Sequence, residues 1–202
     1  MQMRLFISRR NATKSSHETS IEWHAQPSNK IKKVIIATHV SSFLDLYKDY
    51  TENDLGLASD LSKEKWLTKM IEDDLNDVSE GKLFLATISL QDTIAGFVIC
   101  APTKSRRENL KADVYISILA IKPFRDFNTE SKIHIGLGKL LVNAVSEAFF
   151  SANTITLDTR RINQDAMSFY ERIGFSSTGD RTLGGSNPKY YTGYEKSVMR
   201  KV

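Results

Sequence analysis

The chain has 202 residues, of which 41% are hydrophobic and 26% are charged, and its formal net charge is +4. This length and composition are typical of one globular domain, with or without a tail, that buries a substantial core. No apolar run approaches the roughly 20 residues that a membrane helix needs, so we expect no membrane partner.

The cysteine and histidine content argues against a disulfide framework and against a metal centre. Cys100 is the single cysteine, which excludes an internal disulfide and predicts a reducing compartment, the cytoplasm. Cys100 lies within an apolar run, where an inert buried thiol is expected. The four histidines have no metal-ligand spacing, so we expect no metal.

Residues 1–30 lack a sustained hydrophobic period and are interpreted as an N-terminal extension, followed by one domain over residues 31–202. The first seventeen residues contain no acid and several basic and hydroxyl residues, a composition that resembles an organellar transit peptide. A polar extension explains the same composition and is the preferred interpretation. Within it, Leu5–Ser8 or Ile21–Trp23 are candidate edge strands.

The first regular elements are predicted from a β-branched run and from helical spacing. Lys33–Thr38 is rich in β-branched residues and predicts a strand. Ser42 and Asp45 have the spacing of a capping box, which predicts a short helix through Tyr50. A second helix is predicted from apolar residues at helical spacing, with Gly81 as its stop: Trp66, Leu67, Met70, Ile71, Leu75 and Val78.

The rest of the chain alternates strands and helices. The predicted strands are Leu83–Leu90, Ile94–Ala101, Val114–Ile121, Thr154–Asp158, Phe175–Ser177 and Tyr190–Val198, and the predicted helices are Gly138–Phe150 and Gln164–Arg172. Strands outnumber helices, and hairpins stand at both ends of this order. The pattern predicts an α+β fold with a mixed sheet between helices, not a doubly wound parallel sheet.

Two glycines, Gly136 and Gly138, open the helix before the Thr154 strand. A helix N-terminus offers unpaired N–H groups and a partial positive charge, and glycine lets these amides approach a phosphate closely. Lys139 adds a positive charge. A P-loop is excluded because no glycine precedes this pair at the required distance, and a Rossmann fingerprint fails because Leu141 stands in place of its third glycine.

The segment from Asn163 to Phe175 combines a helix N-cap, a buried helix face and a helix stop. Ala166, Phe169 and Tyr170 share that face, and Gly174 suits a left-handed C-cap. A purely structural interpretation, with Asn163 as a cap and Tyr170 as core, remains open at this point.

The order of the two segments resembles the GNAT superfamily of acetyl-CoA-dependent N-acetyltransferases. The family pattern Asn-x-x-Ala-x-x-Phe-Tyr-x-x-x-Gly-Phe is met from Asn163 to Phe175, and the Gly-x-Gly of its phosphate-binding turn at Gly136 and Gly138. The resemblance covers roughly residues 32–200. It implies a three-layer fold whose central mixed sheet is mostly antiparallel, with acetyl-CoA as cosubstrate and an amine-bearing small molecule or protein as acceptor.

The resemblance also implies roles for individual residues. Tyr170 occupies the position of the general acid that protonates the departing CoA thiolate. A backbone amide near Leu119 and Ala120 is expected to stabilise the oxyanion of the thioester carbonyl. The cofactor-binding positions carried over from the family are Leu119, Ala120, Ile121, Ile135, Gly136, Leu137, Gly138, Lys139 and Asn163.

Three features depart from the family pattern. Ile133 replaces the usual Gln or Arg of the phosphate turn, and the loop from Pro123 to Lys132 is longer than usual. Ser117 stands where many relatives carry a glutamate base, and serine is no base. Asp113 and Glu195 are candidates for that role, and a neutral amine would need none.

Two alternatives to an active amine acetyltransferase stay open. One is a CoA-binding module that has lost catalysis, which the departures at Ile133 and Ser117 motivate. The other is an acetyltransferase acting on aminoacyl-tRNA, which the positive charge motivates. The basic clusters are small, Arg106-Arg107 and Arg160-Arg161, so we do not expect a nucleic-acid partner. The acceptor site is expected at Thr51–Leu61 and Thr178–Lys189, in a monomer or a homodimer.

Overall fold

The computed structural model describes residues 4–5, 19–57, 60–103, 113–122, 136–183 and 189–198. These residues form eight strands and four helices. The strands are β1 (Arg4–Leu5), β2 (Thr19–His24), β3 (Phe84–Leu90), β4 (Thr93–Thr103), β5 (Asp113–Ile121), β6 (Thr154–Arg160), β7 (Ser176–Leu183) and β8 (Lys189–Ser197). The helices are α1 (Asn29–Leu46), α2 (Lys63–Ser79), α3 (Leu137–Ala148) and α4 (Gln164–Arg172).

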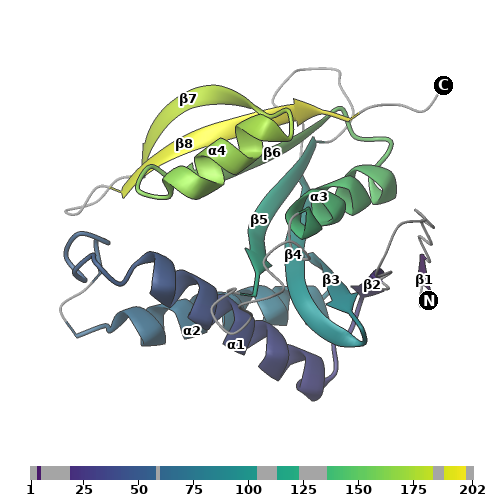
Figure 1. The fold of residues 1–202 in the computed structure, drawn as a ribbon, viewed down its shortest axis with the longest axis horizontal. Helices are drawn as coiled ribbons and strands as arrows, with labels where there is room; N and C mark the ends of the chain where they lie inside the picture. The colour runs from purple at the N-terminus through teal and green to yellow at the C-terminus, as the bar shows by residue number, and fades with distance from the viewer. Residues whose placement is uncertain are drawn as a thin grey trace, which may run out of the picture.

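The described strands join in one sheet, in the order β1-β2-β3-β4-β5-β6-β8-β7 (Figure 1). Every neighbouring pair is antiparallel except β5 and β6, which are parallel. The predicted α+β fold with a mixed, mostly antiparallel sheet is therefore confirmed. The two strands predicted at Val114–Ile121 and Thr154–Asp158 are neighbours in this sheet.

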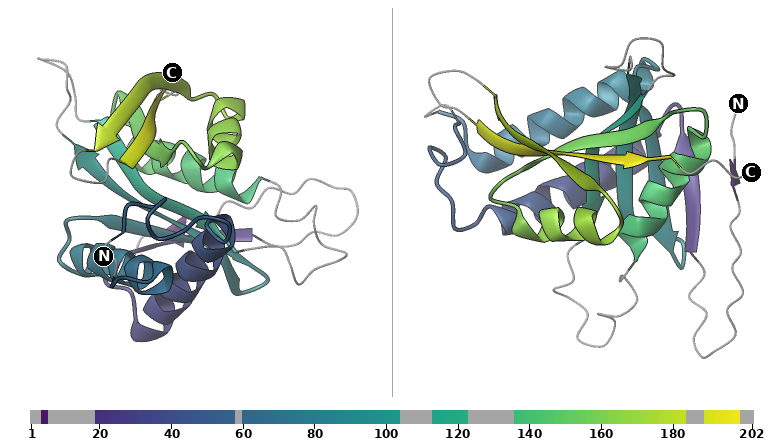
Figure 2. Two further views of the ribbon diagram at one scale, coloured as in Figure 1. Left: turned by 90° about the vertical axis from the view of Figure 1, so that its left-hand side faces the viewer. Right: turned by 90° about the horizontal axis from the view of Figure 1, so that it is seen from above.

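Helices cover both faces of the sheet (Figures 1 and 2). On β4, Phe97 and Ile99 face a core that they share with α1 and α2. Val98 and Cys100, which alternate with them, face a second core beneath α3 and α4. The alternation of a β-strand thus gives the three layers that the sequence predicts.

The first helix corrects two predictions. The strand predicted at Lys33–Thr38 is wrong, because these residues lie in the middle of α1. The separate helix predicted from Ser42 is wrong too, since α1 runs through that position. The N-cap is Ser28, whose side chain accepts a hydrogen bond from the N–H of Ile31 at 3.4 Å.

Packing against the sheet explains why Lys33–Thr38 is helical despite its high β propensity. Ile31, Ile35 and His39 follow one another at helical spacing, and Ile35 and His39 are fully buried. Ser42, one turn further, donates to the carbonyl of Thr38 at 2.7 Å and to that of Ile121 at 3.0 Å. The helix is thereby tied to the end of β5.

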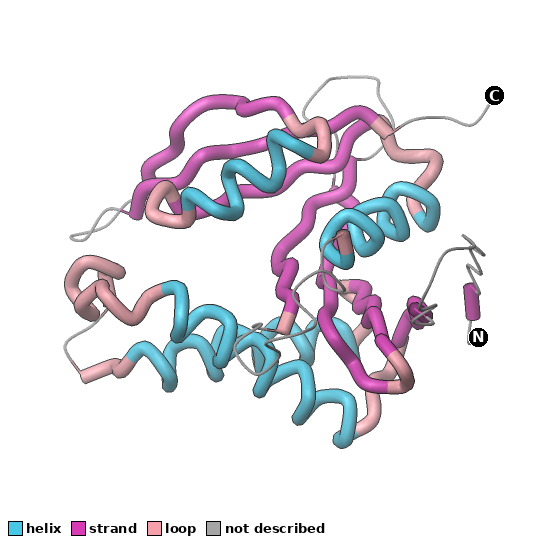
Figure 3. The backbone as a smooth tube through the Cα atoms, in the orientation of Figure 1, coloured by secondary structure: helices cyan, strands magenta, loops and turns pink. Residues whose placement is uncertain are grey.

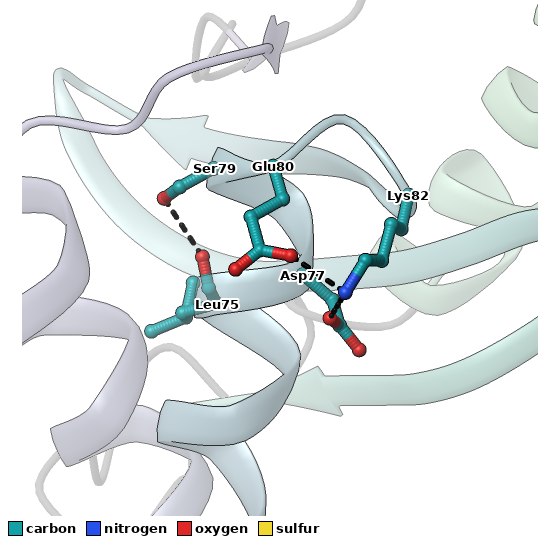
Figure 4. Close-up of polar contacts among 5 residues, drawn as sticks. All are labelled: Leu75, Asp77, Ser79, Glu80 and Lys82. Carbon is teal, nitrogen blue, oxygen red and sulfur yellow. Dashed lines mark hydrogen bonds and ion pairs between the residues drawn. The ribbon is translucent and has the colours of Figure 1, made fainter.

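The C-terminal end of α2 is held by side-chain contacts (Figure 4). Ser79 donates to the carbonyl of Leu75 at 2.9 Å, one turn back. Lys82 lies 2.6 Å from a carboxylate oxygen of Glu80 and 3.0 Å from one of Asp77. The hydrogen bonds that Lys82 donates to these two carboxylates raise its pKa. Asp77 therefore has a structural partner at the helix end.

The remaining predicted helices and strands are confirmed, as is the helix stop at Gly81, where φ is +76°. The strand predicted at Phe175–Ser177 is longer than expected, because β7 continues to Leu183. Two described segments lie within the stretch assigned to an N-terminal extension. Thr19–His24 pairs along its length with β3, as the candidate strand at Ile21–Trp23 implied, and α1 begins at Asn29. None of the described helices is long and apolar enough to cross a membrane.

Candidate active site

Strands β5 and β6 separate halfway along β5, as Figure 3 shows. Their pairing ends at Ile116 and Leu157, although β5 continues to Ile121. The register between β4 and β5 shifts at the same point, so that Ser117 is the extra residue of a β-bulge. Ser117–Ile121 therefore has a sheet neighbour on one side, β4, and an edge that β6 does not cover.

The antiparallel ladder decides which backbone groups face that edge. Lys122 N–H donates to the carbonyl of Ala95 at 2.8 Å, which fixes the alternation of the β4–β5 pair. The backbone groups of Ala120 then point toward β4, and those of Leu119 and Ile121 point toward the uncovered edge. Of the two residues predicted near the oxyanion, Leu119 is the one whose N–H is oriented for that role.

The N-terminus of α3 carries no side-chain cap. Gly136 is the N-cap residue, with φ at +102°, and a Cβ built on it would meet nothing within 4 Å. The first N–H groups of the helix belong to Leu137, Gly138 and Lys139, and the first turn contains no acidic side chain. Among the described residues, no side chain meets the partial positive charge of this helix start, and a phosphate site requires such an open start. Ile135, Ile133 and the loop from Pro123 to Lys132 lie outside the described residues.

Gly138 packs directly against α4. A Cβ on Gly138 would lie 2.9 Å from Cζ of Phe169, closer than real Cβ contacts come. Phe169 in turn stands edge-on to Tyr170, with 5.2 Å between ring centroids. The glycine pair thus has two functions, an open helix start at Gly136 and a close approach of two helices at Gly138.

Tyr170 lies in the core beneath α3 and α4 and is 8% exposed. Its ring also contacts Phe175 and Tyr194, at centroid distances of 5.5 and 6.0 Å. Burial, and in addition the nearby Tyr115 hydroxyl, raise the pKa of Tyr170 well above its usual range. Tyr115 is on β5, two residues before Ser117, and interacts electrostatically with Tyr170.

Asn163 is the N-cap of α4. Its side-chain oxygen accepts a hydrogen bond from the N–H of Ala166 at 3.0 Å. This bond accounts for an asparagine at the position without a cofactor, and the side-chain NH₂ group could still donate to a ligand.

A hydrogen-bonded pair that the sequence did not predict lies where β5 and β6 separate, on the side of the sheet that α2 covers. Ser117 donates a hydrogen bond to Oδ2 of Asp74, on α2, at 2.8 Å. The two candidate bases lie elsewhere. Asp113, at the start of β5, accepts a hydrogen bond from Thr154 at 2.6 Å. Glu195 is on β8, which β6 separates from β5.

A buried arginine joins β6 to the segment between α1 and α2. Arg160 is 8% exposed and donates to the carbonyl of Leu55 at 2.9 Å. Its guanidinium lies 5.1 to 5.8 Å from the ring centroids of Trp66, Tyr47 and Tyr191. A hydrogen bond and three cation–π contacts thus anchor part of the predicted acceptor region, Thr51–Leu61.

The acidic residues of that region differ in their surroundings. Asp54 accepts hydrogen bonds from the N–H and the hydroxyl of Thr51, at 2.8 and 2.7 Å, which lower the pKa of its carboxyl. Its carboxylate therefore closes a local turn. Glu52 is half-buried and Asp60 is exposed.

Cys100 is fully buried, and burial raises the pKa of its thiol to about 12. It is therefore a packing residue, as predicted from its apolar run. Among the described residues, no three His, Cys, Asp or Glu side chains gather as metal ligands would.

Comparisons with known proteins agree with this geometry. Residues 130–175 match the model of the Acetyltransferase (GNAT) family. A crystal structure of a putative GNAT acetyltransferase from Desulfovibrio desulfuricans shares the fold with a TM-score of 0.60 at 16% identity, over 90% of this chain and 99% of that one. The comparison with curated proteins gives no match.

Two further solved structures are similar. The PaiA N-acetyltransferase from Thermoplasma acidophilum, in complex with coenzyme A, has a TM-score of 0.56 at 18% identity, over 88% of this chain and 99% of that one. Aminoglycoside 6′-acetyltransferase type Ii has a TM-score of 0.59 at 16% identity, over 90% and 99%.

The matched segment includes α3, β6 and α4, and so contains Gly136, Gly138 and Tyr170. This segment and the fold are similar to those of GNAT acetyltransferases, which are acyl-CoA N-acyltransferases.

Proposed function

We propose that the protein transfers the acetyl group of acetyl-CoA to a primary amine of a small molecule or a protein. The observation that carries this proposal is the position of two features relative to each other. A strand edge at Leu119–Ile121 that no described strand covers and a helix start at Gly136 that no described side chain caps lie, in the sequence, on either side of the segment that links β5 to α3. An elongated ligand with a phosphate at one end suits both.

In this proposal the diphosphate of acetyl-CoA accepts hydrogen bonds from the amides of Leu137, Gly138 and Lys139. The pantetheine arm runs along the uncovered edge of β5, where its amides pair with the backbone groups of Leu119 and Ile121 in the manner of an added strand. The Lys139 side chain, which is exposed, adds a positive charge near the phosphates.

The chemistry then needs an oxyanion donor and an acid. The amine attacks the thioester carbonyl, and the Leu119 N–H stabilises the oxyanion that forms. The C–S bond breaks as the carbonyl is restored, and Tyr170 protonates the sulfur. A tyrosine whose pKa is raised stays protonated at neutral pH and so is available as the acid.

Charge favours a cationic acceptor. Asp73, Asp74 and Asp77 gather negative charge on the C-terminal half of α2, and Glu52 lies earlier in the chain, between α1 and α2. An ammonium group is attracted to such a surface. The aminoglycoside acetyltransferase among the similar structures is named for a substrate with several amines.

The test is an acetylation assay with a panel of amines. The panel contains spermidine, an aminoglycoside, a lysine peptide and a peptide with a free α-amino group, each incubated with the protein and acetyl-CoA. We expect amine-dependent release of the CoA thiol together with a product that carries one acetyl group by mass spectrometry. CoA binding without transfer to any of these amines would favour the inactive module.

Transfer to an aminoacyl-tRNA instead would favour the RNA-directed alternative. Binding to tRNA would then fall steeply with rising salt concentration, since phosphate contacts release counterions.

A further inference from the structure

The bulge in β5 turns one side chain toward a carboxylate from another layer. Ser117 is the bulged residue, and it directly follows the last residue of β5 that pairs with β6. A bulge redirects the side chain at which it occurs. Here the Ser117 hydroxyl donates to Oδ2 of Asp74 at 2.8 Å, across 43 residues of sequence. Asp74 is thus held at the point where the two strands separate.

Asp74 differs from the acidic residues beside it. Asp77, one turn further, pairs with Lys82 at the helix end (Figure 4). No described lysine or arginine pairs with Asp74, and no described residue donates to its Oδ1. One oxygen is therefore fixed by Ser117, and the other has no donor among the residues that the structure describes.

The surroundings of Asp74 favour proton uptake. Burial raises the pKa of its carboxyl, the hydrogen bond from Ser117 lowers it, and the charges of Asp77 and Asp73 raise it. The net direction is upward. No titratable group of α1, which packs along α2, or of β5 is among the described groups that shift this pKa. A base works best when its pKa lies closer to the operating pH than that of an ordinary carboxyl.

We infer that Asp74 is the catalytic base of the reaction and that Ser117 is its positioning residue. The inference rests on the proposed function. An acceptor amine arrives as an ammonium ion, which has no lone pair and cannot attack a carbonyl. Asp74 takes one proton from this ammonium at Oδ1, directly or through one water.

The remaining protons and bonds then balance. The neutral amine attacks, the C–N bond forms and the C–S bond breaks. The nitrogen loses a second proton as the amide forms, and the sulfur gains the proton of Tyr170. Of the two protons that leave nitrogen, one replaces that of Tyr170 through solvent and the other passes from Asp74 to solvent.

The Asp74–Ser117 pair explains how a serine can stand at the position where many relatives carry a glutamate base. Serine cannot act as a base, but it can orient one, and a hydroxyl at the bulge lies where the strand edge becomes free. The candidates Asp113 and Glu195 have neither feature: Asp113 bonds Thr154, and Glu195 is two strands away from β5.

The test compares Asp74→Asn with Glu72→Gln, at an exposed acidic position of the same helix. Each is assayed with the amine of the panel that the unchanged protein acetylates fastest. We expect Asp74→Asn to lower kcat/KM for the amine about 10²-fold, with unchanged affinity for CoA. The acid limb of the pH profile of kcat/KM should disappear. Glu72→Gln should stay within about twofold, because Glu72 is exposed and is not among the groups that shift the pKa of Asp74.

Ser117→Ala tests the role of Asp74 through the pH profile of kcat/KM, which should not shift if Asp74 has only a structural role. The hydrogen bond from Ser117 lowers the pKa of Asp74, so its loss should shift the acid limb to higher pH, with a smaller loss of activity than in Asp74→Asn. Asp74→Glu, which keeps the carboxylate, should retain part of the activity.

Each result bears on the inference in a distinct way. An active parent protein with Asp74→Asn within threefold of it, or a Ser117→Ala profile that does not shift, overturns the role of Asp74 and leaves the proposed function standing. A parent protein that acetylates no amine overturns the proposed function and this inference with it. Loss of CoA affinity in Asp74→Asn, with no activity in Asp74→Glu, assigns the residue to structure and overturns the inference.

Discussion

Gly138 and Phe169 connect the predicted phosphate turn to the helix that carries the predicted acid. A Cβ at Gly138 would come within 2.9 Å of Phe169 Cζ, and Phe169 packs edge-on against Tyr170. The start of α3 and the ring of Tyr170 are therefore two ends of one packing unit. A change at the turn should be transmitted to the acid through this contact.

Replacing Gly138 by alanine should destabilise the protein. The added methyl group must displace the Phe169 ring, and such overpacking typically costs about 1–3 kcal/mol, of which better helix propensity returns up to about 1. We expect a loss of roughly 1–2 kcal/mol in the free energy of unfolding, measured with urea. The control is Asn143→Ala, at an exposed position of the same helix. Equal stability of both variants would show that Phe169 yields freely.

At Gly136, charge and backbone strain can be separated. Its φ of +102° strains any other residue, so a single substitution would not isolate the phosphate site. Asparagine and aspartate have nearly the same size, and both tolerate positive φ better than most residues. Gly136→Asp should bind CoA at least tenfold more weakly than Gly136→Asn in a calorimetric titration, since the added carboxylate repels the diphosphate. Equal affinities would mean that the phosphate lies elsewhere.

Replacing Tyr170 by phenylalanine should separate chemistry from packing. The ring contacts with Phe169, Phe175 and Tyr194 are kept, so the fold and the affinity for CoA should change little. Turnover should fall at least tenfold, because general acids typically contribute about 10²- to 10⁴-fold. The measurement is kcat for the best amine under conditions in which chemistry limits the rate. Full activity would leave Tyr170 with a packing role alone.

His39 predicts a pH dependence of stability. It is fully buried, its two ring nitrogens have no described hydrogen-bond partner, and burial lowers its pKa from 6.5 to about 4. The unfolded chain therefore takes up this proton first as the pH falls. The contribution of neutral His39 to the free energy of unfolding is fully present above about pH 6.5 and is lost progressively between that pH and 4.

The matching experiment replaces His39 by phenylalanine, which can keep the ring contacts with Phe43 and Phe97. Between pH 7 and pH 5 the unchanged protein should lose about 2 kcal/mol more stability than the variant, at about 1.4 kcal/mol per pKa unit. All other titrating groups are common to both proteins, so the difference isolates His39. Parallel pH profiles would contradict the neutral buried state.

The sequence predicts the sheet and three of the four helices, because hydrophobic spacing and glycine stops mark them. It fails at α1, where the β-branched run Val34–Ile36 favours a strand and the polar residues His39 and Ser42 interrupt the apolar face. Both are buried or bonded only because the sheet lies over them. The alternative signal was Ser28 followed by Ile31, Ile35 and His39 at helical spacing.

The candidate site is predictable where it follows one stretch of chain. Gly136, Gly138 and Tyr170 stand in a short, ordered segment with a recognisable pattern. The contact of Asp74 with Ser117 joins α2 to β5 across 43 residues, and no local pattern marks it. The contacts of Arg160 could not be predicted either, because its three aromatic partners are far apart in the sequence. They are Tyr47 directly after α1, Trp66 on α2 and Tyr191 on β8.

The central claim is that acetyl-CoA lies along the free edge of β5 with its diphosphate at the start of α3. Amide hydrogen exchange with and without acetyl-CoA tests it most directly, because the claim names the amides that become bonded. We predict slower exchange at Leu119 and Ile121 and at Leu137–Lys139 on addition of acetyl-CoA, with α2 and β2 unchanged. Exchange that slows elsewhere, with these two segments unaffected, would contradict the account.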